Sequence, residues 1–264
     1  MDFNEQALAS RLSGRHIGRS VHFLQAADST NDIAFRLALE GASEGTVVVA
    51  DRQMKGKGRL NRVWQSPPKC NLYTSIILRP VIDPVNAPQI TLMTGVVMAD
   101  LISRYHSADV TLKWPNDVQI RGRKVCGILT EMRVSANQRV DFVIVGIGIN
   151  INMRRFDFED SFREEATSLM EEMGTEISRL DFTARLYCDF EKWYDTWIAQ
   201  GFNAVKKEWL KYAWMIGKRI QVAFCGDIRT GEVLGIDDCG ALLLLDGDGA
   251  IKKIMAGDAS ILKE

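Results

Sequence analysis

The sequence lacks the features that mark secreted proteins, membrane-spanning proteins and proteins with a structural metal site. Its five cysteines are odd in number and widely spaced, without a C-x-x-C pair, which argues against a disulfide framework or a zinc cage and predicts reduced thiols. Its three histidines show no metal-ligand spacing. No apolar run reaches about 18 residues, and the N-terminus lacks the apolar core of a signal peptide. We therefore expect a cytoplasmic protein with no membrane partner.

The composition supplies material for a large core but little excess charge. The 264 residues are 46% hydrophobic and 25% charged, with a formal net charge of −1. This length allows one large core with a small second domain. A protein whose whole surface binds nucleic acid or an anionic membrane is usually basic overall, and this one is not. If positive side chains bind a ligand here, we expect them in a local cluster.

Helical and strand-like patterns alternate through residues 1–215 and predict an α+β domain. A helix is expected from Ser29 to Gly41, with Ser29 as N-cap and Asp32 closing a capping box. The other expected elements are strands at 46–50, 71–78, 110–114, 124–134 and 140–149 and helices at 88–105, 178–199 and 203–214. Trp193, Trp197 and Trp209 fall on the apolar sides of the last two helices.

The remaining residues, 216–264, change to short strands separated by turn signals. Gly226-Asp227, Gly231, Asp237–Gly240 and Asp246–Gly249 all carry turn-forming residues. This pattern predicts a small all-β barrel as a second domain.

A cationic loop follows the β-branched run at 46–49. Residues 52–62 contain five cations and no acid, and Gly56 and Gly58 allow the backbone to approach a ligand closely. Arginine donates in a planar fork that matches phosphate oxygens, so the loop is a candidate clamp for a phosphorylated ligand. Composition alone supports equally well a solvent-exposed loop that binds nothing.

Three further segments carry candidate chemistry. Lys113-Trp114-Pro115-Asn116-Asp117 ends a strand, where it can hold phosphate and Mg²⁺ or form a simple turn. Lys124 enters an apolar strand, either pointing into a pocket or lying at the strand end. The alternating glycines of Val145–Asn150 suit a strand on which a flat ligand packs.

No phosphate-loop motif, nucleophile elbow or nucleophile–base pair is present. Any catalysis should therefore rest on positioning and on electrostatic stabilisation.

Taken together, these segments resemble the biotin protein ligases from about residue 22 to the end. The family signatures appear as GKGRLNRVW at 56–64, KWPNDV at 113–118, RKVCGILTE at 123–131 and GIGIN at 146–150. The resemblance implies a class II synthetase-like mixed sheet with helices on one face, followed by an SH3-like barrel. It implies a Mg²⁺-dependent reaction of biotin with ATP to biotinyl-5′-AMP, then transfer to a lysine of a biotin carboxyl carrier domain of acetyl-CoA carboxylase.

The resemblance also assigns roles to residues. Lys124, Arg59 and Lys113 are the expected catalytic residues, and Asp117 is expected at the Mg²⁺. The expected biotin site comprises Ser29, Thr30, Asn31, Gln53, Gly56, Lys57, Gly58, Arg59 and Lys124. The expected ATP site comprises Lys57, Arg59, Arg62, Trp64, Lys113, Asn116 and Asn150.

Two departures from the family pattern stand in the cationic loop. Lys57 replaces the usual arginine and Asn61 a common glycine, and we expect a looser adenylate loop because lysine lacks the bidentate fork. About 20 residues precede the ligase-like region, too few for the DNA-binding module of some members, so no specific DNA binding is expected. A homodimer is left open. The alternatives are a lipoate-protein ligase and, in another class, a non-catalytic nucleic-acid-binding module.

Overall fold

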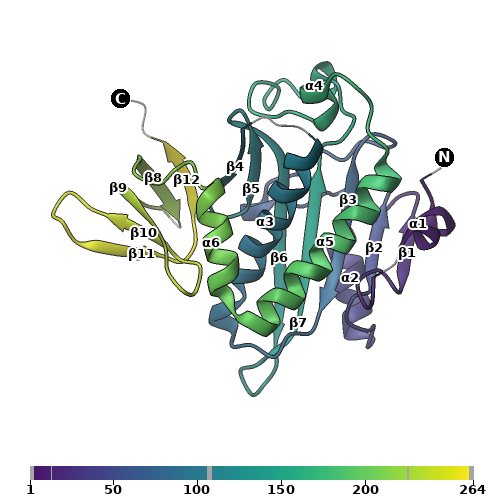
Figure 1. The fold of residues 1–264 in the computed structure, drawn as a ribbon, viewed down its shortest axis with the longest axis horizontal. Helices are drawn as coiled ribbons and strands as arrows, with labels where there is room; N and C mark the ends of the chain where they lie inside the picture. Colours follow the sequence, from purple (N-terminus) through teal and green to yellow (C-terminus); the bar gives the residue numbers. More distant parts are fainter. Residues whose placement is uncertain (1–2, 13, 106–108, 225, 262–264) are drawn as a thin grey trace.

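The computed structural model describes residues 3–12, 14–105, 109–224 and 226–261. They form a seven-stranded mixed sheet flanked by helices and a separate five-stranded antiparallel sheet (Figure 1). The expected α+β class with a small C-terminal β domain is confirmed. The boundary between residues 215 and 216 stays a prediction.

The large sheet has the strand order β1-β2-β3-β7-β6-β5-β4, in which only the β1–β2 pair is parallel. Its strands are β1 (Val21–Leu24), β2 (Val47–Ala50), β3 (Leu72–Leu78), β4 (Val110–Lys113), β5 (Asp117–Ile120), β6 (Arg123–Val134) and β7 (Val140–Ile149). The strands expected from the sequence are present. β1 and β5 were not expected, and β5 forms because the Trp114–Asn116 segment turns the chain back on β4.

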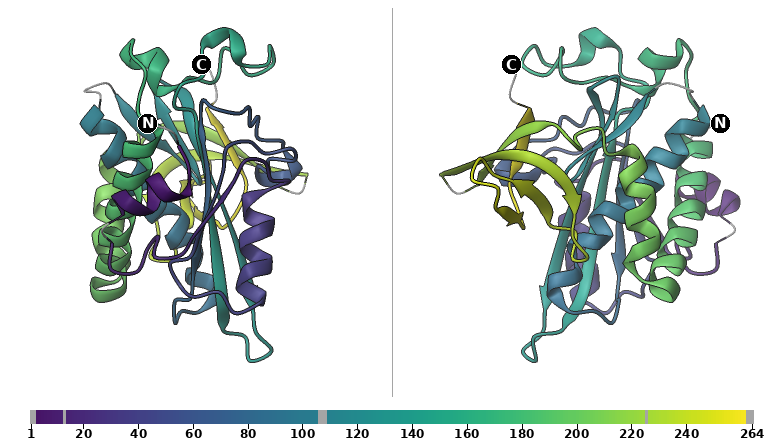
Figure 2. Two further views of the ribbon diagram at one scale, coloured as in Figure 1. Left: turned by 90° about the vertical axis from the view of Figure 1, so that its right-hand side faces the viewer. Right: turned by 60° about the vertical axis from the view of Figure 1, so that its left-hand side comes forward.

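Three long helices cover one face of this sheet: α3 (Pro88–Tyr105), α5 (Arg179–Gln200) and α6 (Phe202–Tyr212). The helix α2 (Thr30–Leu39) lies on the opposite face (Figure 2). Successive side chains of β7 point to opposite faces of the sheet, so β7 contacts helices on both sides. Val143 and Val145 join the core under the long helices, while Phe142 and Ile144 pack with α2. The tryptophans behave as expected, with Trp197 and Trp209 buried and Trp193 packed against the core.

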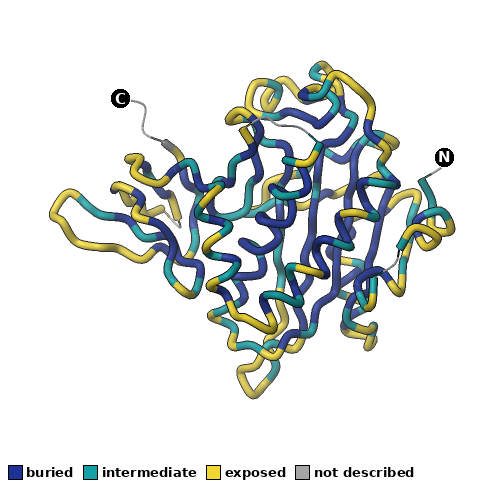
Figure 3. The backbone as a smooth tube through the Cα atoms, viewed as in Figure 1, coloured by how far each residue is buried: buried dark blue, intermediate teal, exposed yellow. Residues whose placement is uncertain are grey.

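The stretch Pro84–Tyr105, which includes the short turn η2 (Pro84–Asn86) and α3, is long and apolar enough to cross a membrane by composition. Within the structure, 72% of its most apolar window is buried. Figure 3 shows it among the dark, buried segments between the sheet and the outer helices. It is therefore a core helix of the folded chain.

The acid-rich segment after β7, residues 150–173, pairs with the start of β6. It contains η3 (Arg155–Asp157) and α4 (Leu169–Met173). The backbone N–H of Lys124 donates to Glu165 O (2.7 Å), and the N–H of Thr167 donates to Lys124 O (2.9 Å). The fully buried carboxylate of Glu172 accepts from Thr167 (2.7 Å) and pairs with Arg123 (2.6 Å). These contacts hold the segment beside Lys124.

The small sheet has the order β11-β10-β9-β8-β12. Its strands are β8 (Arg219–Phe224), β9 (Asp227–Ile236), β10 (Leu242–Leu245), β11 (Ile251–Ile254) and β12 (Asp258–Ile261). The expected turn at Gly231 is wrong: this residue lies inside β9, and glycine is needed there because the carbonyl oxygen of Leu245 passes 2.6 Å from where a Cβ would be. Trp114 ties the two sheets by donating to Gly240 O (3.1 Å).

The cysteines that the structure describes are free thiols, and burial raises the pKa of Cys70 to about 11. Cys225 and His106, which the sequence analysis included among the thiols and the histidines, lie outside the described residues. Within the described part of the chain, no group of three His, Cys, Asp or Glu side chains is placed to hold a metal.

Glu191 on α5 holds the segment after α1 (Glu5–Arg11). Its carboxylate accepts from the backbone N–H groups of Arg15, His16 and Ile17, each at 2.8 Å. Burial raises the pKa of this carboxyl, but the three hydrogen bonds outweigh burial and leave the pKa below its ordinary value. The charged form is therefore the stabilising one.

Replacing Glu191 with alanine is expected to lower the free energy of unfolding by about 2–3 kcal/mol, because buried N–H donors lose their acceptor. Since the folded-state pKa lies below the unfolded value of about 4.3, the carboxylate stabilises fully above that pH and this contribution is lost as the pH falls. Urea unfolding at pH 7 and in acid measures both effects. Equal acid sensitivity of the parent chain and Glu191→Gln would contradict this assignment.

Candidate functional site

A cavity of about 810 Å³ opens between the large sheet, the cationic loop, the acid-rich segment and the start of β12. Residues from distant parts of the chain meet there. Among the residues that the sequence analysis assigned, those that line the cavity are Ser29, Thr30, Asn31, Gln53, Lys57, Gly58, Arg59, Arg62, Trp64, Lys113, Asn116, Asp117, Lys124 and Asn150.

The floor of the cavity consists of glycines on the face of the sheet that also carries α2. Gly146 and Gly148 follow Ile144 at alternate positions of β7, and Gly148 pairs directly with Gly127 on β6. A Cβ at Gly148 would come within 2.6 Å of the Trp64 indole, and one at Gly127 within 2.9 Å. The glycines therefore leave the space that Trp64 needs to pack against the two strands.

One end of the cavity is a buried polar network at the start of α2. The backbone N–H of Thr30 donates to Gln53 Oε1 (2.8 Å), and Ser75 Oγ lies 2.6 Å from Asn31 Oδ1. The amide of Asn31 also donates to Glu131 (2.7 Å). Neutral donors and acceptors fixed in this way suit a small ligand with amide-like edges.

The expected capping box at this helix start is wrong. Ser29 occupies the N-cap position, but its side chain makes no capping hydrogen bond. Gln53 supplies the acceptor for the first turn instead, and Asp32 forms an ion pair with Lys57. The physical reason is the neighbouring cationic loop, whose lysine attracts the carboxylate that would otherwise cap.

The cationic loop crosses the other side of the cavity, and its arginines contact distant segments. It forms a single turn, η1 (Arg59–Asn61), in which Leu60 and Asn61 have positive φ values of 54° and 60°. Arg59 donates to Asn116 Oδ1 (3.2 Å) and to Gly257 O (3.0 Å), while Arg62 pairs with Asp258. Burial lowers the pKa of Arg59, and its guanidinium nevertheless stays charged at neutral pH.

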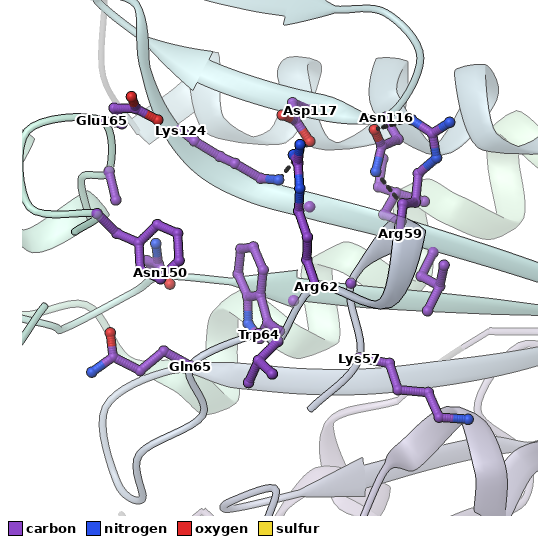
Figure 4. Close-up of a pocket in the computed structure, with 18 of the residues that line it drawn as sticks. Lys57, Arg59, Arg62, Trp64, Gln65, Asn116, Asp117, Lys124, Asn150 and Glu165 are labelled. Carbon is purple, nitrogen blue, oxygen red and sulfur yellow. Dashed lines mark hydrogen bonds and ion pairs between the residues drawn. The ribbon is translucent and has the colours of Figure 1, made fainter. Parts of the chain in front are cut away.

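Lys124 and Asp117 meet where the two ends of the cavity join (Figure 4). Lys124 Nζ lies 2.6 Å from Asp117 Oδ1 and 5.3 Å from the centroid of the Trp64 ring. Lys113 is the register partner of Asp117 across the β4–β5 hairpin. One carboxylate beside two lysines fits Mg²⁺ only if phosphate oxygens complete the shell, which is how Mg²⁺ is usually held.

Of the assigned residues, Gly56 does not line the cavity and Asn150 does. Gly56 packs instead against Ser66 and the Trp64 backbone, so closely that a Cβ there would come 2.6 Å from Ser66 Oγ and clash with the backbone of Trp64. The Asn150 amide donates to Thr167 O (3.0 Å). Its position is thus fixed by the acid-rich segment.

The sequence analysis missed a set of lining residues that come from the acid-rich segment, the residues just after α6 and the small domain: Met153, Phe158, Phe162, Glu164, Glu165, Ala166, Trp214, Asp258 and Ser260. No local motif marks these residues. Their role follows only from the contacts that bring these segments to the cavity.

A glycine-floored cavity with an amide-lined end and a cationic end defines a site for an acid and a phosphorylated partner. The chain matches the model of the biotin/lipoate A/B protein ligase family over residues 23–150 and that of the biotin protein ligase C-terminal domain over residues 215–262.

Relatives agree with both matches. The bifunctional ligase/repressor BirA of Bacillus subtilis is 38% identical over 98% of this chain and 79% of that protein. The biotin–[acetyl-CoA-carboxylase] ligase of Paracoccus denitrificans is 31% identical over 82% of this chain and 90% of that protein. The structure of Aquifex aeolicus biotin protein ligase in complex with biotin and ATP is 30% identical, covers 93% of this chain and all of that one, and has a TM-score of 0.79. The chain belongs to the biotin protein ligase family.

Proposed function

We infer that this chain joins biotin to ATP as biotinyl-5′-AMP and then transfers biotin to a lysine of a biotin carboxyl carrier domain. One observation carries this conclusion. The amide-lined pocket at Thr30 and Asn31 and the cations Arg59, Lys113 and Lys124 face a single cavity in a member of the biotin protein ligase family.

In the first step the biotin carboxylate attacks the α-phosphate of ATP, a P–O bond forms, and pyrophosphate leaves. The two reactants are anions that repel each other in water. Arg59, Lys113 and Lys124 offset this repulsion in a site partly closed by Trp64 and the acid-rich segment, where charges interact more strongly. Bound Mg²⁺, held through Asp117 and the phosphates, would neutralise the leaving pyrophosphate.

The biotin would lie over the Trp64 indole and the Asn31 amide, which cover the floor glycines, with its ureido ring toward Asn31, Thr30 and Gln53. Its valeryl chain then runs along β7 and brings the carboxylate to Lys124 and Arg59. The nucleotide would occupy the side bordered by Trp64, Asn116 and Asn150. In the second step the acceptor amine attacks the acyl carbon, an amide forms, AMP leaves, and the amine proton passes to solvent.

Exchange of labelled pyrophosphate into ATP tests this function. Biotin should stimulate the exchange and lipoate should not, because the polar network at Asn31 matches a ureido ring and not a dithiolane. Stimulation by lipoate alone would instead assign a lipoate-protein ligase. Full transfer should also require ATP and a purified carrier domain.

A nucleic-acid-binding module receives less support than the ligase. Lys55, Lys57 and Arg62 are already paired with Asp28, Asp32 and Asp258, and the net charge is −1. We propose weak, non-specific DNA binding at most, and a tight, sequence-selective complex that persists in high salt would contradict this. Cytoplasmic location and a homodimer stay predictions.

A further inference from the structure

The cavity that would hold a reactive acyl-adenylate also contains the chain's own amines. Lys57, Lys113 and Lys124 all line it. A mixed anhydride acylates an amine whose nitrogen has a free lone pair, and an ammonium bound to a carboxylate has none. The intermediate therefore survives only if the lysines that reach it stay protonated.

Lys57 differs from Lys124 in its partner, since Lys57 pairs with Asp32 on α2 and Lys124 with Asp117 on β5. The Lys57 ammonium forms an ion pair with Asp32 in the first turn of α2, and the two side chains are 41% and 51% exposed. In Figure 4 the Lys57 side chain points away from Lys124 and Asp117. An arginine, usual at this position in the family, is always protonated and is not acylated in this way.

We propose that Lys57 is a self-acylation site and that Asp32 suppresses the modification by holding the ammonium outside the reaction zone. The proposal rests on the proposed ligase function. When the pair opens, the flexible four-carbon stem allows deprotonated Lys57 to attack the acyl carbon of biotinyl-5′-AMP. The new C–N bond gives biotinyl-Lys57, the acyl–phosphate C–O bond breaks, AMP leaves with the electron pair, and the amine proton goes to solvent.

The neighbouring pair Lys55–Asp28 provides a matched control. It joins the same loop to Asp28, two residues before α2, at 2.8 Å, and Lys55 lies outside the cavity lining. Removing Asp28 frees a loop lysine that does not face the intermediate. Removing Asp32 frees one that does.

The test supplies biotinyl-5′-AMP directly to the full chain without a carrier domain and quantifies biotin on each lysine by peptide mass spectrometry. Asp32→Asn should raise the rate of labelling at Lys57 about two- to fivefold, the range expected when an exposed ion pair is lost. Asp28→Asn should leave labelling at Lys57 at the parent level. Asp32→Asn combined with Lys57→Arg should carry no biotin at position 57.

Equal labelling of Lys57 in the parent chain and in Asp32→Asn, with the added adenylate bound by both, would overturn the proposal. Equal increases in Asp28→Asn and Asp32→Asn would also overturn it. Because the adenylate is added ready-made, this result is separate from failure of the proposed function, which would appear as absent biotin-stimulated pyrophosphate exchange in the parent chain.

Discussion

Replacing Lys124 with methionine is expected to lower kcat/KM for biotin adenylation by about 10²–10³-fold, the usual effect of removing one preorganised group that stabilises developing charge. Lys124 lies beside Asp117 and over the Trp64 ring, at the junction of the amide-lined and cationic ends. Methionine keeps the length of the side chain but leaves the carboxylate and the α-phosphate without the nearest positive charge.

Biotin-dependent pyrophosphate exchange measures this effect, with Lys192→Met on the distant surface of α5 as the control for losing a lysine. Transfer from added biotinyl-5′-AMP should fall much less than adenylation, because the two anions have already been joined. Adenylation within threefold of the parent chain would show that Lys124 is not the group that overcomes their repulsion.

The second large effect is expected from Gly146→Ala, which should raise the Kd for biotin by about 10- to 100-fold. A Cβ at this position would overlap Asn31 Oδ1 and come 2.8 Å from Asn31 Cγ. Asn31 cannot easily yield, because Ser75, Glu131 and Leu129 O hold its amide. Overpacking of this kind costs about 1–3 kcal/mol, which corresponds to that change in affinity.

Gly148→Ala is the matched comparison, two residues further along the same face of β7. Its Cβ would displace Trp64 rather than Asn31. It should therefore raise the KM for ATP more than the Kd for biotin. Calorimetric titration with biotin separates the two variants, and an unchanged biotin affinity in Gly146→Ala would contradict the placement of the ureido ring.

The part of the site that local sequence predicts is the part built from single strands and turns. The alternation of Val145–Asn150 predicts a face of glycines, and the Pro-Asn-Asp sequence after Lys113 predicts the turn, although the second strand of the resulting hairpin, β5, was not expected. In both cases neighbours in sequence determine what lies together, so periodicity and turn chemistry suffice.

The remainder depends on contacts between distant segments. Asp258 meets Arg62 across 196 residues of sequence, and nothing near either residue marks the pair. The acid-rich segment reaches the cavity because its backbone pairs with Lys124, a contact that side-chain patterns do not record. Gln53 replaces Ser29 and Asp32 as the cap of α2 for the same reason, since the tertiary partner competes with the local one.

A crystal structure with a non-hydrolysable analogue of biotinyl-5′-AMP tests the central claim most directly. The ureido ring should lie against Thr30 and Asn31, and the acyl–phosphate linkage should lie between Arg59 and Lys124. A linkage placed away from both cations, or an analogue bound in another cavity, would contradict the account.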